Sequence, residues 1–328
     1  MNSDAASLSC LPGLRVGHAH DADVRTGVTV VLPDRPALCA VDVRGGGPGT
    51  RETDTLALGG LIDRVHAIVL SGGSVYGLAA ADAVAARLGA ERTGYAASAD
   101  PAVPVSPIVP AAILFDNANG GNKDWGDRPP FAALGRAALD AVSGDTPEGR
   151  VGAGFGAMAG TYPGGLGVAS ERARDARVWA LIAANPVGSP FLPGTAVPYA
   201  WIYGRDDEFG GAAPPANYRW SAPTDTKLSG RSDTGEKPGL GPGQNTVIGL
   251  VATDAALGPS DLKRLAIMAQ DGIAMAVQPA HTPLDGDTLF AISVGECPAD
   301  GPVAVSELGA AAARAVARAL TRGVLAAH

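Results

Sequence analysis

Apolar residues gather along this chain in short runs, separated by clusters of glycine, proline and polar residues. Runs that are rich in β-branched residues and end at such a cluster are typical of strands. They predict strands over residues 27–32, 37–43, 66–70, 178–184, 246–252 and 289–294, with a glycine-punctuated strand region over 151–167. Longer alanine-rich stretches with helical spacing predict helices over residues 78–88, 131–142, 259–276 and 305–325.

These elements alternate without the regularity of βαβ units, and several strands adjoin with no helix between them. The pattern favours two sheets between helical layers over a doubly wound sheet. Hydrophobic residues make up 46% of the 328-residue chain but aromatic residues only 5%, so a large core must pack small side chains closely. Residues 204–245 are rich in Asp, Gly, Pro, Ser and Lys and keep no period, which predicts a mobile linker.

Composition excludes several classes of protein. The net charge is −8 and no basic cluster is present, which argues against a nucleic-acid partner. No apolar run approaches the roughly 18 residues of a membrane span, and the first residues lack the features of a signal peptide. The three cysteines, Cys10, Cys39 and Cys297, are too widely spaced for a disulfide framework. We therefore expect a cytoplasmic protein, with Cys39 as a small core residue.

The sharpest local feature is a change from polar to apolar sequence at Thr246. The segment 241–245, GPGQN, leads directly into the predicted strand that Thr246 begins. A threonine hydroxyl in this place can attack its own preceding carbonyl, and the released threonine then carries both a nucleophile and a basic α-amine. Without further evidence, an ordinary strand after a loop explains the same pattern.

Two other segments carry polar groups suited to catalysis. Asp285 and Asp287 flank a glycine, so both carboxylates can converge on one point and hold an ammonium group. Asn185 ends a predicted strand, where its amide can donate a hydrogen bond to an oxyanion. The alternatives are a surface Asp-Gly turn and a common Asn-Pro turn.

Eight segments together resemble the P1/S58 peptidase family, which includes L-aminopeptidase D-Ala-esterase/amidases, β-aminopeptidases and the nylon-oligomer hydrolase. They lie in order along nearly the whole chain, at residues 13–21, 45–54, 70–84, 107–116, 152–160, 185–188, 245–255 and 281–291.

The resemblance implies an α-β-β-α sandwich of the aminopeptidase/ornithine acetyltransferase type, formed as one catalytic domain over residues 1–328. It implies self-cleavage between Asn245 and Thr246 into a large subunit, 1–245, and a small subunit, 246–328. Thr246 matches the family's nucleophile and Asn185 its oxyanion-hole asparagine. Asp285 and Asp287 match the acidic pair of the nylon-oligomer hydrolase, and tetramers are usual in the family.

The chain departs from the family pattern in three places. Ile113-Leu114-Phe115 stands where aminopeptidase members have a Glu-x-Tyr pair, whose Glu helps hold a substrate ammonium. Thr161 stands where the nylon-oligomer hydrolase has a lysine near the nucleophile, and Pro163 stands where other members have a lysine. Phe115, Thr161 and Tyr76 are the pocket candidates, although a packing role explains Tyr76 equally well. The segment 18–21, HAHD, is expected to be a solvated turn, because no further His or Cys cluster completes a metal site.

These observations predict a hydrolase that acts on small peptides or amides through an acyl-Thr246 intermediate, with no metal and no cofactor. One alternative is an acyltransferase that passes the same ester to an amine acceptor, and another is a non-cleaving binding protein of the same fold. Small N-terminal residues, D-amino acids, β-peptides and ω-amino-acid oligomers all remain open as substrates.

Overall fold

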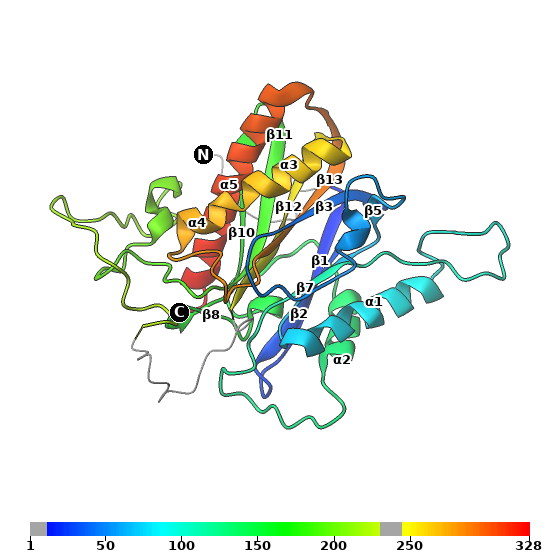
Figure 1. Ribbon diagram of the computed structural model, residues 1–328, viewed down its shortest axis with the longest axis horizontal. Helices are drawn as coiled ribbons and strands as arrows, with labels where there is room; N and C mark the ends of the chain where they lie inside the picture. Colours follow the sequence, from blue (N-terminus) through cyan, green and yellow to red (C-terminus); the bar gives the residue numbers. More distant parts are fainter. Residues whose placement is uncertain (1–11, 230–244) are drawn as a thin grey trace.

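The computed structural model describes residues 12–229 and 245–328, and its strands form two sheets that lie face to face (Figure 1). The five-stranded sheet has the order β1 (Leu14–Asp21), β2 (Thr26–Pro33), β6 (Ile68–Ser71), β7 (Ala111–Ile113) and β4 (Thr50–Arg51). The six-stranded sheet has the order β10 (Leu166–Ala173), β11 (Ala176–Asn185), β12 (Thr246–Ala256), β13 (Thr288–Pro298), β3 (Ala37–Val43) and β5 (Arg64–Val65). A separate hairpin joins β8 (Met158–Ala159) to β9 (Tyr162–Pro163).

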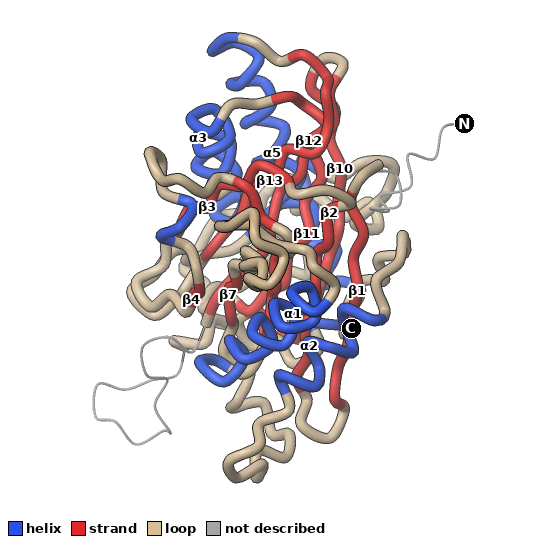
Figure 2. Tube along the Cα trace, turned by 90° about the vertical axis from the view of Figure 1, so that its right-hand side faces the viewer, coloured by secondary structure: helices blue, strands red, loops and turns tan. Residues whose placement is uncertain are grey.

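Helices cover the outer face of each sheet (Figure 2). The five-stranded sheet carries α1 (Ala79–Ala90) and α2 (Phe131–Asp140), and the six-stranded sheet carries α3 (Pro259–Ala269), α4 (Asp271–Ala276) and α5 (Gly301–Leu325). Short 3-10 turns are η2 (Asp54–Leu56), η3 (Ser74–Leu78), η4 (Gly152–Gly154) and η5 (Tyr199–Tyr203). The layers therefore run helices, sheet, sheet, helices, and the predicted mixed α/β class is confirmed.

One of the two central strands of the six-stranded sheet is β12, which runs antiparallel to β11 and parallel to β13. One of its faces packs against the other sheet, because Ile248 and Leu250 belong to the same buried cluster as Val31 and Leu70 of the five-stranded sheet. Its other face packs beneath the helices, which is why this strand reads as an unbroken apolar run. Thr246, at the start of β12, is thus fixed by a strand that is held on both sides.

Two local predictions are wrong. Residues 151–167 were expected to form strand, but they form η4 and the β8–β9 hairpin before β10 begins. Residues 18–21 were expected to form a turn, but they belong to β1 and pair with residues 26–29 of β2. Pairing with β2 overrides the polar character of this segment. The helix predicted over 259–276 divides at Gln270 into α3 and α4, and Cys39 is buried as expected.

The first part of the predicted linker packs against the domain. Glu208 forms ion pairs with Arg318 and Arg322 on α5, and Phe209 is buried. Residues 230–244 of the predicted linker lie outside the described residues. None of the helices in the described parts of the chain is long and apolar enough to cross a membrane.

Candidate active site at the start of β12

Thr246 and Asn185 meet where β12 begins and β11 ends. The antiparallel register places them opposite each other, and both are buried. The Thr246 hydroxyl donates a hydrogen bond to the carbonyl oxygen of Asn245, the residue just before it. The nucleophile expected from the sequence therefore lies against the peptide group that it is expected to attack.

Gly286 supplies a backbone N–H group to the same place. This group donates to the Asn245 carbonyl oxygen over 3.0 Å and lies 3.2 Å from Thr246 Oγ1. A β-carbon on Gly286 would stand 2.8 Å from Thr246 Oγ1 and 2.6 Å from the Gly47 carbonyl oxygen, so only glycine fits. The Gly286 N–H is placed to stabilise negative charge that develops on the Asn245 carbonyl.

Asp287 binds the backbone directly after Thr246. Its Oδ1 accepts a hydrogen bond from Val247 N over 2.8 Å, and its Oδ2 accepts from His281 Nδ1 over 2.7 Å and from His281 N over 3.2 Å. Burial by itself lowers the pKa of His281, but the hydrogen bond and charge of Asp287 outweigh it and raise that pKa. His281 thus strengthens the hold of Asp287 on the start of β12.

Asp285 binds the backbone directly after β11. Its Oδ1 accepts from Val187 N over 3.0 Å, and its Oδ2 accepts from Thr282 N over 2.8 Å and from Thr282 Oγ1 over 2.7 Å. Burial, and then the negative charge of Asp287, raise the pKa of Asp285. The two aspartates therefore tie the segment 281–287 to both strand ends that carry the site.

The side chain of Asn185 is held in one orientation. Its Oδ1 accepts from Met158 N over 2.9 Å, and its Nδ2 donates to the Phe115 carbonyl oxygen over 3.0 Å. The Met158 N–H is a donor only, so it fixes which end of the amide is oxygen.

Lys227 also lies at this site, and the sequence interpretation missed it. Its Nζ donates to Asn185 Oδ1 over 3.1 Å and to the Asn185 carbonyl oxygen over 3.2 Å. The residue is half-buried, and enclosure of its amino group lowers the pKa of Lys227 to about 7 against the opposing charge of Asp285. Lys227 lies in the predicted linker, where no pattern marks it, and the only hint was that Thr161 replaces a family lysine.

A cavity of about 200 Å³ adjoins Asn185. Its wall is formed by Phe115, Asp116, Ala118, Asn119, Gly156, Met158, Gly160, Asn185 and Lys227. Of the three pocket candidates, only Phe115 borders it. Tyr76 lies half-exposed against Trp125, and Thr161 is exposed, next to the wall residue Gly160.

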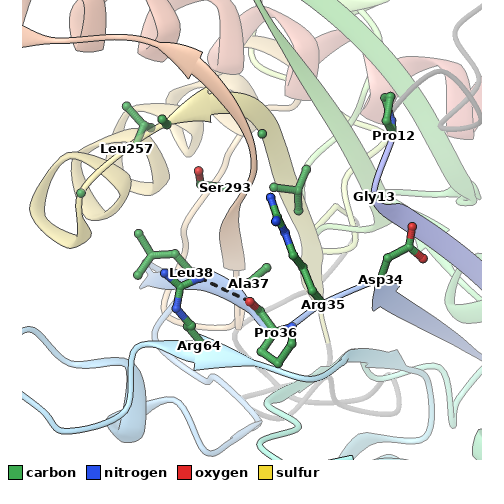
Figure 3. A pocket seen from close by; sticks show the side chains of 14 residues that line it. Pro12, Gly13, Asp34, Arg35, Pro36, Ala37, Leu38, Arg64, Leu257 and Ser293 are labelled. Atoms are coloured by element: carbon green, nitrogen blue, oxygen red, sulfur yellow. Dashed lines mark hydrogen bonds between the residues drawn. The ribbon is translucent and has the colours of Figure 1, made fainter.

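A larger cavity of about 940 Å³ lies at the other end of β12 (Figure 3). Arg35 and Leu38 border it together with Leu257 and Ser293, and none of the site residues does. Within residues 12–229 and 245–328, no three His, Cys, Asp or Glu side chains converge as a metal site.

Comparisons with known proteins identify the family of this chain. Residues 7–328 match the model of peptidase family S58. An uncharacterized aminopeptidase of Mycobacterium tuberculosis is 41% identical over 97% of this chain and 93% of its own length. A 6-aminohexanoate-oligomer endohydrolase of Paenarthrobacter ureafaciens is 33% identical over 87% of this chain and 74% of its own length.

Solved structures share the fold at lower identity. A β-aminopeptidase of Burkholderia sp. superposes with a TM-score of 0.69 at 23% identity, over 98% of this chain and 86% of that one. The L-aminopeptidase D-Ala-esterase/amidase of Ochrobactrum anthropi, described as a variant of the Ntn hydrolase fold, gives 0.68 at 22% identity, over the same shares of the two chains.

Proposed function

Because the chain belongs to peptidase family S58 and is a hydrolase of peptide or amide bonds, we propose that it cleaves itself between Asn245 and Thr246 and then uses Thr246 as an N-terminal nucleophile. The single observation that carries the proposal is the position of the Thr246 hydroxyl against the Asn245 carbonyl, with the Gly286 N–H on that carbonyl oxygen.

Self-cleavage proceeds by an acyl shift from nitrogen to oxygen. The Thr246 hydroxyl oxygen attacks the Asn245 carbonyl carbon, and the Gly286 N–H stabilises the resulting oxyanion. The C–N bond then breaks and the Thr246 nitrogen takes the hydroxyl proton, which leaves an ester. Water hydrolyses the ester to a carboxylate at Asn245, a free hydroxyl and a free amine at Thr246.

The mature enzyme repeats this chemistry on a substrate. The free Thr246 amine has an ordinary pKa of about 7.7–8.0, so it can take the hydroxyl proton near neutral pH. The Asn185 Nδ2 group supplies a hydrogen bond to the substrate oxyanion, and Asp287 fixes the strand beside the amine through Val247. The proton passes to the leaving amine, and water then releases the acyl group from Thr246.

Small peptides and amides are the proposed substrates. The cavity beside Asn185 holds only about 200 Å³, which suits a short acyl group, and Phe115 and Met158 give it apolar surface. The names of the relatives, aminopeptidase and 6-aminohexanoate-oligomer endohydrolase, support peptide and amide bonds as the bonds that are cleaved. An added acceptor amine in the assay distinguishes hydrolysis from acyl transfer, because only a transferase yields a new amide.

The test compares the wild type with Thr246→Ala and Thr246→Ser on a denaturing gel, with mass spectrometry of the smaller fragment. We expect the wild type to give fragments of roughly three-quarters and one-quarter of the 32.7 kDa chain, the smaller one beginning at Thr246. Thr246→Ser should still cleave, and Thr246→Ala should remain intact and inactive. An active enzyme that stays one unbroken chain contradicts the proposal.

A further inference from the structure

Lys227 contacts Asn185 but has no role in the chemistry proposed above. Its amino group lies not on a carboxylate but on the two oxygen atoms of Asn185, one from the side chain and one from the backbone. Lys227 is half-buried, and a neutral amide compensates little of the hydration that its enclosed ammonium group loses, so this placement is costly. Lys227 borders the same cavity as Asn185, so its charge faces the space where a substrate carbonyl would lie.

We propose, on the basis of the function proposed above, that Lys227 is a positioning residue: it holds and polarises the Asn185 side chain so that one Nδ2 hydrogen points at the substrate oxyanion. The hydrogen-bond inventory of Asn185 supports this. Its Oδ1 accepts from Met158 N and from Lys227 Nζ, and of the described residues only Phe115 accepts from Nδ2. An amide nitrogen has two hydrogens, so one is left for a ligand.

The charge of Lys227 strengthens this donor. A cation on the oxygen of an amide draws electron density from its nitrogen, and linked hydrogen bonds reinforce one another in an enclosed site. A pre-oriented donor of this kind typically contributes a factor of about 10²–10³ to kcat.

The backbone around Lys227 fixes its position. The Lys227 N–H donates to the Val187 carbonyl oxygen over 3.0 Å, and the Asp225 carbonyl oxygen accepts from Thr161 N over 3.0 Å. Asp225 Oδ2 also accepts from Ser189 Oγ over 2.8 Å. The loop thus binds the backbone at Thr161 and brings an amino group to the site from a different part of the chain.

Protonation of Lys227 gives the proposal a measurable signature. Enclosure lowers the pKa of Lys227 to about 7, although the negative charge of Asp285 favours the ammonium form. Asp116 is the other carboxylate that borders the same cavity. The ammonium form, which polarises Asn185, is present below this pKa and is lost as pH rises through it. The basic limb of the kcat–pH profile should therefore lie near neutral pH in the wild type.

The test measures kcat, KM and the kcat–pH profile of wild type, Lys227→Met and Lys227→Arg, with alanine p-nitroanilide and a 6-aminohexanoate oligomer as probes. We expect Lys227→Met to lower kcat by about 100-fold with KM changed less than about threefold. Lys227→Arg should recover at least a tenth of the wild-type kcat, and its basic limb should move to higher pH because a guanidinium stays charged. Wild-type kcat and an unmoved profile in Lys227→Met would overturn the proposal.

Lys263→Met is the matched control. Lys263 also donates two hydrogen bonds, to the Val41 carbonyl oxygen over 2.6 Å and to Asp42 Oδ1 over 2.9 Å, but it does not border the cavity. We expect an unchanged pH profile in this variant. An equal loss of kcat in Lys263→Met and Lys227→Met would show that the loss comes from a general fall in stability, and it would overturn the proposal.

Self-cleavage separates this inference from the proposed function. Lys227→Met should still cleave before Thr246, because Gly286 serves that step, and an intact Lys227→Met chain beside a cleaved wild type would assign Lys227 a different role. If Lys227→Met does not fold, Lys227→Arg decides, and an unmoved basic limb in that variant rejects the inference. An uncleaved but active wild type instead rejects the proposed function itself.

Discussion

At the scale of single residues, the surroundings of Thr246 are organised by backbone N–H groups. The Gly286 N–H donates to the Asn245 carbonyl oxygen, and Asp287 and Asp285 accept from the N–H groups of Val247 and Val187. The sequence predicted that these two carboxylates converge on one point, but in the structure they accept from different N–H groups. What it did not predict is that they act on the backbone of both strand ends.

Gly286→Ala should slow self-cleavage by about 100-fold, the typical cost of losing one oxyanion donor. The added β-carbon would stand 2.6 Å from the Gly47 carbonyl oxygen and 2.8 Å from Thr246 Oγ1, so the N–H must move away from the Asn245 carbonyl. A time course of fragment formation during refolding measures the rate. Gly258→Ala is the control, since nothing lies within 4 Å of its β-carbon. Cleavage at the wild-type rate in Gly286→Ala would show that the Gly286 N–H takes no part in self-cleavage.

His281→Gln should remove a pH-dependent part of the stability. Asp287 raises the pKa of His281 in the folded protein, so the folded state binds that proton more tightly than the unfolded chain does. This contribution is fully present below the unfolded pKa of about 6.5 and is lost as pH rises through the raised folded pKa. Urea unfolding between acidic and mildly alkaline pH should show the difference between wild type and His281→Gln shrinking as pH rises. A difference that grows with pH would contradict this assignment.

At the scale of helices and strands, elements with a clear local pattern were predictable. β2, β3, β11 and β12 follow β-branched or continuous apolar runs, and α1, α2 and α5 follow alanine-rich helical spacing. Elements whose structure depends on distant partners were not. Residues 18–21 are polar and become strand only by pairing with β2, and residues 151–167 contain too many glycines for the pattern to distinguish a hairpin from a long strand.

The site shows the same division. Thr246, Asn185 and the two aspartates stand at element ends that the pattern marks, and the resemblance to the peptidase family supplied their expected roles. Lys227 reaches Asn185 only because its loop binds Thr161 and Val187, residues far away in sequence. Such non-local backbone contacts leave no local periodicity, and composition alone made the segment look like a linker.

Gly167→Ala should destabilise the contact between β10 and α5. The low aromatic content predicted close packing of small side chains, and a β-carbon on Gly167 would stand 1.9 Å from the Ala319 carbonyl oxygen of α5. The helix must move outward, which typically costs about 1–3 kcal/mol. Thermal unfolding should show a lower Tm. Gly89→Ala in α1 serves as the control, since its β-carbon would make only an ordinary 3.6 Å contact with Pro107, and an equal fall in Tm for both variants would refute the packing argument.

At the scale of the whole molecule, the proposed cut leaves the two fragments interlocked. β12 would begin the small fragment, yet it pairs with β11 of the large one, and β13 of the small fragment pairs with β3 of the large one. The hydrophobic core between β12 and the helices likewise contains residues from both fragments, before and after the proposed cut. We therefore expect the fragments to co-elute in size-exclusion chromatography and to separate only in denaturant. Separation in native buffer would contradict this arrangement.

A group of ion pairs adds an electrostatic link across the same boundary. Glu208, on the large side of the proposed cut, accepts from Arg318 Nε over 2.7 Å and from Arg322 over 3.1 Å, and both arginines lie on α5. Burial alone raises the pKa of Glu208, but the hydrogen bonds and charges of these arginines outweigh it and lower that pKa.

Glu208→Gln should therefore lower the stability of the assembled protein by about 2 kcal/mol at neutral pH, because the buried Arg318 and the half-buried Arg322 lose one of their carboxylate partners and keep only Glu171 and Glu148, respectively. Because the pKa of Glu208 is lowered in the folded protein, its contribution to stability is present above the unfolded pKa of about 4.3 and is lost as pH falls through the folded pKa. Urea unfolding of wild type and variant should thus diverge at neutral pH and converge in acid. Glu307→Gln is the control, since its pair with Arg174 is exposed and should contribute less than about 1 kcal/mol. Equal losses in the two variants, or a difference that persists in acid, would show that the Glu208 carboxylate does not link α5 to the preceding chain.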